Sequence, residues 1–151
     1  MQLKKVVVVC YKNTYGTETA LKKILTKLKI KHTCINRDKL SRRKLGKADL
    51  IITVGGDGTF LRTSQHVLDT PVFTVASSLK KSEGFFSRAS RTDLERKIKL
   101  IIAGKYKITK LNRLESTIRH GKKAFKPELA VNEVKTIAKR RNPVYRMLEK
   151  V

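Results

Sequence analysis

The stretch that most constrains the fold is LIITVGGDGTF, at residues 50–60. Its apolar, β-branched first half predicts a buried strand, and three glycines around Asp57 follow at once. Small residues at the carboxyl end of a parallel strand let backbone N–H groups approach a phosphate, and a helix that begins there adds its dipole. Asp57 in such a loop is placed to accept a proton from an attacking hydroxyl. A tight glycine turn with Asp57 as a plain helix N-cap is the alternative.

The first hundred residues alternate between strand patterns and helix patterns. Apolar runs predict strands over 6–10, 31–37, 48–54 and 71–75. Helices are expected between them, on the apolar spacing of residues 21–28, over 57–67 directly after the glycines, and over 92–102. This rhythm predicts an α/β fold with an open, largely parallel sheet and helices on both faces.

The pattern changes after Gly104, which has the position of a helix C-cap glycine. Residues 105–119 and 128–138 alternate as strands around a turn at 120–122. We therefore expect an α/β nucleotide-binding domain over 1–103, followed over 104–151 by the start of an antiparallel all-β domain. A β domain with only two or three strands has open edges, which predicts a covering partner.

The charge of the chain is unusual, because 36 Lys and Arg residues face 12 Asp and Glu residues and give a formal net charge of +24. Such a field favours anionic partners, including nucleic acid and nucleotides. The basic residues are spread over the whole chain, however, and aromatic residues make up only 6% with no Trp, so no stacking platform for single strands is evident. A basic proteome or a hot or salty cytosol explains the same charge. Nucleic acid is therefore a weaker expectation than a nucleotide.

Two further features bear on the setting of the protein. Cys10 and Cys34 lie in apolar strand-like runs without the spacing of metal ligands, and we interpret them as buried free thiols in a reducing cytosol. No apolar run approaches the roughly 18 residues of a membrane span. We expect a soluble, cytoplasmic protein without a membrane partner.

Two motifs carry a resemblance to a known family. GGDGTFLR, at 55–62, resembles the GGDGT signature shared by NAD kinases, diacylglycerol-type lipid kinases and, more loosely, phosphofructokinases. ELAVNEV, at 128–134, resembles the Asn-Glu motif of the NAD kinases, and SEGF, at 82–85, follows the layout of that family. The chain is divergent, since Ala76 stands where the family has Asn. It also resembles a C-terminally truncated member, because the family's second domain normally continues well beyond residue 151.

The resemblance implies a role for each matching residue. Asp57 would be the catalytic base, which takes the proton from the adenosine 2′-hydroxyl of NAD as that oxygen attacks the γ-phosphate of ATP. The phosphates of ATP would lie on the loop residues Gly55, Gly56, Gly58 and Thr59. NAD would contact Asp57, Gly58, Arg62, Asn132, Glu133 and Arg146. Mg²⁺ would enter with ATP, and no separate protein metal site is expected.

Each of these roles has a plainer alternative. Asn132 and Glu133 in an alternating strand can be exposed polar residues, and Arg62 can be a solvated helix charge. For the whole chain, the leading hypothesis is an NAD kinase-like phosphotransferase that forms NADP, as a homo-oligomer or with a partner chain that supplies the remaining β domain. The alternatives are another GGDGT-type kinase for a small molecule or lipid, and a non-catalytic basic nucleotide- or RNA-binding module. ATP and polyphosphate both remain open as the donor.

Overall fold

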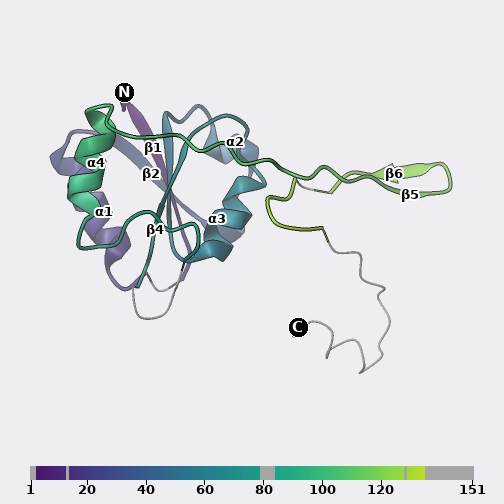
Figure 1. Ribbon diagram of the computed structural model, residues 1–151, viewed down its shortest axis with the longest axis horizontal. Helices are drawn as coiled ribbons and strands as arrows, with labels where there is room; N and C mark the ends of the chain where they lie inside the picture. The colour runs from purple at the N-terminus through teal and green to yellow at the C-terminus, as the bar shows by residue number, and fades with distance from the viewer. Residues whose placement is uncertain (1–2, 13, 79–83, 128, 135–151) are drawn as a thin grey trace.

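The computed structural model describes residues 3–12, 14–78, 84–127 and 129–134. Their main feature is a four-stranded, all-parallel sheet in the order β2-β1-β3-β4 (Figure 1). The strands are β1 (Lys5–Cys10), β2 (Lys31–Asn36), β3 (Leu50–Val54) and β4 (Val72–Val75). The predicted parallel α/β fold is confirmed, and each strand lies within about two residues of its expected position.

The four valines at the centre of β1 explain why the sheet is covered on both faces. Val6–Val9 are fully buried, and alternate residues of a strand point to opposite faces. Val6 and Val8 pack in one apolar cluster with α1 (Thr17–Lys27) and α4 (Leu94–Ile102). Val7 and Val9 pack in a second cluster with Leu45 of the short helix α2 (Arg42–Leu45). In Figure 1, α1 and α4 lie on one side of the sheet, and α2 and α3 (Asp57–Ser64) lie on the other.

The end of α4 confirms the predicted role of Gly104. This residue has a φ of 74°, in the left-handed region that glycine adopts without strain. Its N–H donates to the carbonyl of Ile101 at 3.1 Å, and the N–H of Lys105 donates to the carbonyl of Leu100 at 2.9 Å. These two hydrogen bonds form a Schellman motif, which ends the helix and turns the chain away from it.

The stretch after β2 has helical structure of its own, and the expected burial of the two cysteines was wrong. The polar basic stretch after β2 contains a 3-10 helix (Arg37–Lys39) and α2, because Ser41 caps α2 by accepting a hydrogen bond from the N–H of Lys44 at 3.3 Å. The two cysteines are free, as predicted, but Cys34 is exposed and Cys10 only half-buried. Cys34 lies on β2, an edge strand whose side chains are mostly exposed.

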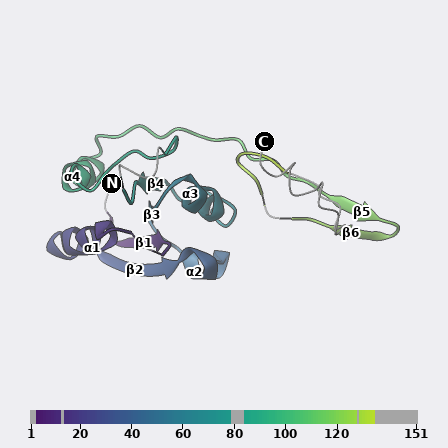
Figure 2. The same ribbon diagram turned by 90° about the horizontal axis from the view of Figure 1, so that it is seen from below.

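Residues 105–134 differ from the expected pair of long strands. Among the described residues of this segment, only β5 (Ile118–His120) and β6 (Lys123–Phe125) pair, as a short antiparallel hairpin, with one further bridge between Leu114 and Ala130. The prediction of a strand over 105–119 was therefore wrong for most of its length, since the described residues pair with 105–117 only at Leu114. Of the strand predicted over 128–138, residues 128 and 135–138 lie outside the described residues. The hairpin extends away from the parallel sheet (Figures 1 and 2).

One side chain joins this extended segment to the α/β part. The guanidinium of Arg113 donates to the carbonyl of Ser64 at 2.9 Å and also to the carbonyl of Val67. The carbonyl of Ser64 lies at the C-terminal end of α3, where backbone oxygens lack helical partners and cations are favourable, and Val67 follows three residues later. Arg113 thus holds the segment against α3. Within the described ranges, no helix has the length and apolar content that a membrane crossing requires.

Candidate active site

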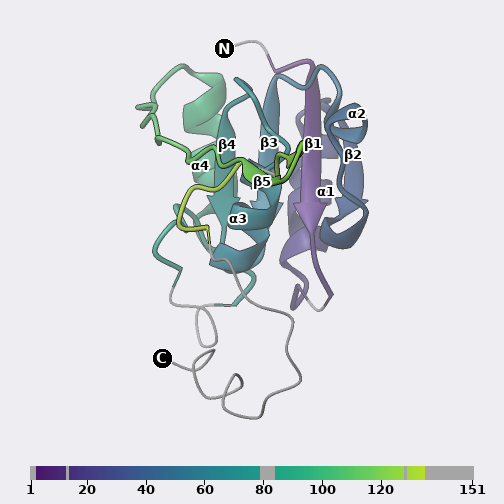
Figure 3. The same ribbon diagram turned by 90° about the vertical axis from the view of Figure 1, so that its right-hand side faces the viewer.

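A cleft of about 160 Å³ lies at the carboxyl edge of the sheet. In Figure 3 the arrow of β1 points toward this edge, away from the N-terminus. The cleft is lined by residues that follow β1, β2, β3 and β4: Tyr11, Lys12, Thr14, Arg37, Val54, Gly55, Gly56, Gly58, Thr59 and Ser77. The chain leaves β1 toward β2 on one side and returns to β3 on the other, so the loops after β1 and β3 diverge. Open α/β sheets bind ligands in the crevice at such a switch point.

The glycine loop forms one wall of the cleft and is tightly folded. A Cβ on Gly55 would lie 2.4 Å from Oγ1 of Thr59, closer than real side chains approach, so only glycine fits there. The N–H of Gly55 donates to the carbonyl of Val75, and the N–H of Thr59 donates to the carbonyl of Gly56, both at 2.9 Å. Gly58 is exposed at the surface of the loop. The four loop residues predicted to bind phosphates are therefore together in the cleft wall.

Asp57 begins α3, but its side chain does not cap that helix, whose N-cap is Gly56. Its two carboxylate oxygens instead accept hydrogen bonds from the N–H groups of Phe85 and Phe86, each at 3.0 Å. The interpretation of Asp57 as a plain N-cap is therefore wrong. A carboxylate offers about four lone-pair sites, so two hydrogen bonds leave it able to accept a further donor. Asp57 is half-buried and fixed in orientation beside the glycine loop.

The segment that holds Asp57 is itself packed closely. A Cβ on Gly84 would lie 2.3 Å from Oγ of Ser87 and 3.3 Å from Oδ1 of Asp57. The ring of Phe86 contacts the ring of Phe60 on α3, with centroids 4.5 Å apart. Glycine at position 84 thus allows the backbone to approach the carboxylate. The SEGF resemblance pointed to this segment, but the contact with Asp57 was not predicted.

Arg37 is a cation in the cleft lining that was not predicted from the sequence. Its guanidinium carbon lies 3.7 Å from the centroid of the Tyr11 ring, and a Cβ on Gly58 would lie 3.6 Å from its NH1 nitrogen. The side chain is 24% exposed. One signal could have found it: Arg37 ends the predicted strand at 31–37, and the carboxyl ends of parallel strands meet at one edge. Lys12 adds a second cation to the cleft lining.

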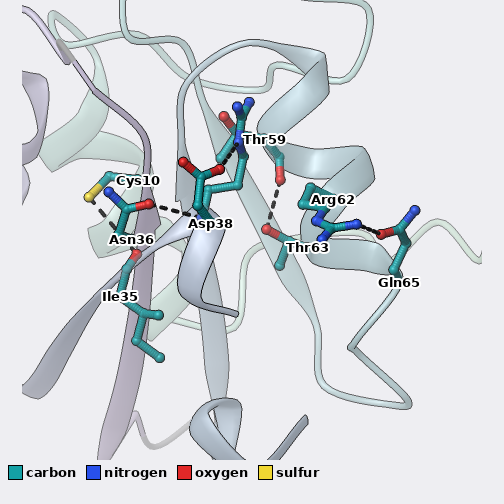
Figure 4. Close-up of polar contacts among 9 residues, drawn as sticks. Cys10, Ile35, Asn36, Asp38, Thr59, Arg62, Thr63 and Gln65 are labelled. Atoms are coloured by element: carbon teal, nitrogen blue, oxygen red, sulfur yellow. Dashed lines mark hydrogen bonds and ion pairs between the residues drawn. The ribbon is translucent and has the colours of Figure 1, made fainter. Parts of the chain in front are cut away.

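Asp57 lies next to the lining residues Gly56 and Gly58 but is not itself part of the cleft lining, and the other predicted contact residues also lie outside it. Arg62 is exposed and donates to Oε1 of Gln65 at 2.9 Å, so it points along α3 toward its C-terminal end (Figure 4). Asn132 and Glu133 are exposed in the segment that follows the hairpin. Arg146 lies outside the described residues. The structure thus brings together the glycine loop and Asp57, but it does not join the Asn-Glu motif to them.

A second hollow of about 170 Å³ lies on the other side of Ser77. Its lining includes Ala76, the residue that departs from the family pattern, which is 5% exposed. Arg91 borders the same hollow and donates to the carbonyl of Tyr15 at 3.4 Å. Alanine therefore leaves this hollow without the amide side chain that the resemblance implied.

Neither cysteine has the properties of a catalytic nucleophile. Burial, followed by a hydrogen bond to Glu18, raises the pKa of the Cys10 thiol to about 12. The residue Cys34 is exposed, but partial desolvation of its thiol by neighbouring groups still raises its pKa. Both thiols stay protonated at neutral pH, and the thiolate is the reactive form. In the part of the chain that the structure describes, no group of three His, Cys, Asp or Glu residues is arranged to hold a metal ion.

A parallel sheet with a glycine loop at its switch point defines a nucleotide-binding class of α/β protein. The comparison with known families makes this assignment more specific. The sequence profile of the ATP-NAD kinase N-terminal domain matches residues 2–106, which is most of the chain. The chain therefore belongs to the NAD kinase family.

Individual relatives agree with this assignment. The chain is 24% identical over 134 residues to the NAD kinase of Acetivibrio thermocellus, covering 89% of this chain and 45% of that protein. It is 30% identical over 100 residues to the NAD kinase of Saccharophagus degradans, covering 66% of this chain and 32% of the relative. It is 33% identical over 89 residues to the bifunctional NADP phosphatase/NAD kinase of Methanocaldococcus jannaschii, covering 59% of this chain and 15% of that protein.

A solved structure has the same fold. The crystal structure of yeast NADH kinase complexed with NADH matches with a TM-score of 0.65 at 19% identity, over 86% of this chain and 46% of that one. The chain thus spans less than half the length of the relatives described here.

Proposed function

We propose that this chain carries the catalytic half of an NAD kinase, an enzyme that transfers the γ-phosphate of ATP to the adenosine 2′-hydroxyl of NAD and so forms NADP. The observation that carries the proposal is the carboxylate of Asp57, held by two backbone N–H groups beside a glycine loop at the switch point of the sheet. Family membership supports NAD as the acceptor.

The proposed chemistry needs few groups. Asp57 accepts the proton of the 2′-hydroxyl while that oxygen bonds to the γ-phosphorus, and ADP leaves with the electrons of the broken P–O bond. Gly55, Gly56, Gly58 and Thr59 form the surface on which the ATP phosphates lie. Mg²⁺ enters as the ATP complex, where phosphate oxygens are its principal ligands, and it neutralises phosphate charge. The remaining work is positioning, which supplies much of the rate enhancement in phosphoryl transfer.

The NAD-binding residues beyond the loop form the less supported part of the proposal. Asn132 and Glu133 would hold the NAD ribose, and Arg62 and Arg146 would contact NAD, once residues 104–151 are part of a complete β domain. We propose that residues 1–103 form the α/β domain and that a further copy or a partner chain supplies the remaining β structure. Exposed apolar side chains in residues 105–134 support the proposal that a further chain packs against this segment. The expected setting is the cytoplasm.

The experiment measures NADP formation from NAD and MgATP. The chain is assayed alone and mixed with a fragment that carries the C-terminal half of the Acetivibrio thermocellus NAD kinase. Removing the base in Asp57→Asn is expected to lower the rate by about 10²- to 10⁴-fold. Asp69→Asn is the matched control, because Asp69 is exposed in the loop before β4, and its rate should be unchanged.

Two results would contradict the proposal. One is the absence of NADP in every mixture. The other is equal activity of Asp57→Asn and Asp69→Asn. Phosphorylation of a lipid or another small molecule in place of NAD would indicate a different GGDGT-type kinase. Salt-dependent RNA binding without nucleotide binding would indicate a non-catalytic module.

A further inference from the structure

We propose that Arg37 is a phosphate-binding residue of the cleft and that the ring of Tyr11 holds it in position. Its ligand is the di- or triphosphate group of a nucleotide, bound between the guanidinium and the glycine loop. The identification of the ligand as a nucleotide rests on the proposed function, whereas the phosphate contact itself does not. No sequence motif assigned a role to either residue.

The guanidinium of Arg37 stacks on the ring of Tyr11 and has one weak ion pair. Its carbon lies 3.7 Å from the centroid of the Tyr11 ring, well inside the 6 Å range of a cation–π interaction. Its Nε lies 3.6 Å from Oδ1 of Asp38, and the Asp38 side chain is 57% exposed. Because the distance is long and Asp38 is more than half exposed, this pair contributes little and leaves the positive charge of Arg37 largely uncompensated. The two terminal nitrogens of the Arg37 guanidinium donate no hydrogen bond to any residue that the structure describes.

The guanidinium faces the surface that the proposed function assigns to phosphates. NH1 of Arg37 lies 3.6 Å from the position of a Cβ on Gly58, so the cation and the loop border the same space. Planar, bidentate donors match phosphate oxygens, and backbone N–H groups of a glycine loop at a helix N-terminus provide donors on the other side. The chain therefore surrounds one volume with a cation and a glycine cradle.

The size of the cleft limits what enters it. At about 160 Å³ it is smaller than the roughly 300 Å³ at which pockets for drug-sized ligands begin. It can hold phosphate groups but not a complete nucleotide. We infer that the phosphates occupy the cleft while the nucleoside lies outside it. This division makes binding of the phosphate part measurable without the rest of the substrate.

The test is calorimetric titration of the folded chain with inorganic pyrophosphate, without magnesium, at constant ionic strength. Arg37→Met is expected to weaken binding about 10- to 100-fold, the range for losing charge-assisted hydrogen bonds. Arg43→Met is the matched control, because Arg43 is exposed on α2 and carries the same charge. Its affinity should change by less than about twofold, since a surface charge acts only through the screened field.

Variants of Tyr11 test the positioning role separately. Tyr11→Leu removes the ring and is expected to weaken pyrophosphate binding about three- to tenfold, while Tyr11→Phe keeps the ring face and should restore it. A purely structural role for Tyr11 would lower the melting temperature without this difference between Leu and Phe. If Arg37→Met does not fold, Arg37→Lys replaces it, because Lys keeps the charge but loses the planar fork and is expected to bind more weakly.

The outcomes separate this inference from the proposed function. Equal affinities for Arg37→Met and Arg43→Met, or no binding of pyrophosphate by the unmodified chain, would overturn the role of Arg37 whatever the enzyme does. Weakened binding in Arg37→Met with no NADP formed in any mixture would support the phosphate site while removing the kinase proposal. NADP formation at an undiminished rate in Arg37→Met would overturn the inference and leave the kinase proposal standing.

Discussion

The α/β part at residues 5–104 and the segment at residues 105–134 use apolar residues in opposite ways. In the first, Val6–Val9 are fully buried between helices on both faces of the sheet. In the second, apolar side chains face solvent, among them Ile108 at 57% and Phe125 at 63% exposure. The comparison teaches that an alternating apolar pattern makes a strand only where a partner strand and a covering layer exist.

A matched pair of truncations in the two regions gives the largest expected contrast. Leu25 on α1 is fully buried, so Leu25→Ala should lower the free energy of unfolding by about 2–5 kcal/mol. Leu111 is 47% exposed, so Leu111→Ala should change it by less than about 0.5 kcal/mol. Urea unfolding followed by circular dichroism measures both. Equal losses in the two variants would show that the segment shares the core of the α/β part.

Two acidic residues, Asp93 in the α/β part and Glu115 in the segment at residues 105–134, allow the two regions to be compared through the pH dependence of stability. Burial alone would raise the pKa of Asp93, but hydrogen bonds from Lys97 and Ser90 outweigh it and lower the pKa from 3.8 to about 2. The folded protein therefore binds this proton less readily than the unfolded chain. The stabilisation is complete above pH 3.8 and is lost as the pH falls toward 2.

The corresponding substitutions are Asp93→Asn and Glu115→Gln. Asp93→Asn should lower the free energy of unfolding at pH 7 by about 1 kcal/mol and flatten its decline between pH 4 and 2. Glu115 pairs with Lys126, and both side chains are more than half exposed, so Glu115→Gln should change neither quantity measurably. Urea unfolding repeated across pH checks the pair. If the free energy of unfolding of Asp93→Asn declined between pH 4 and 2 as it does in the unmodified protein, the lowered pKa of Asp93 would be refuted.

The smallest expected effect concerns the join between the two regions. Arg113→Met removes the hydrogen bonds to the carbonyls of Ser64 and Val67. Global unfolding should change by about 1 kcal/mol or less, while amide hydrogen exchange over 105–117 should become faster. Arg119→Met, at an exposed position of β5, is the control. Equal exchange in both variants would mean that Arg113 does not hold the segment.

The α/β part was predictable because its pattern is local and doubly constrained. An apolar run of β-branched residues, such as Val6–Val9, predicts a strand buried on both faces, and this holds for β1 and β3. All four predicted strands are present in the sheet. The glycine loop and Asp57 were likewise read from one short stretch. Arg37 and Tyr11 were not, because only the strand order β2-β1-β3 places the ends of β1 and β2 beside the loop after β3.

The segment at 105–119 was not predictable for the converse reason. Its alternation is that of a strand, but pairing depends on residues distant in the sequence or on other chains. Only the turn at 121–122 is local, and the pairing it starts extends over three residues on each side. The Asn132-Glu133 motif stays a prediction, since its place in a site depends on the same missing pairing.

The strand order of the sheet has a consequence for how this scaffold can change. The cleft at the ends of β1 and β3 arises from the direction in which the chain crosses over between strands. It is therefore not created by any single side chain. Substitutions at the strand ends alter which ligand is accepted, while the buried valines keep the framework unchanged. Exposed positions of the cleft, such as Gly58, are therefore the ones where ligand choice can change with the least effect on folding.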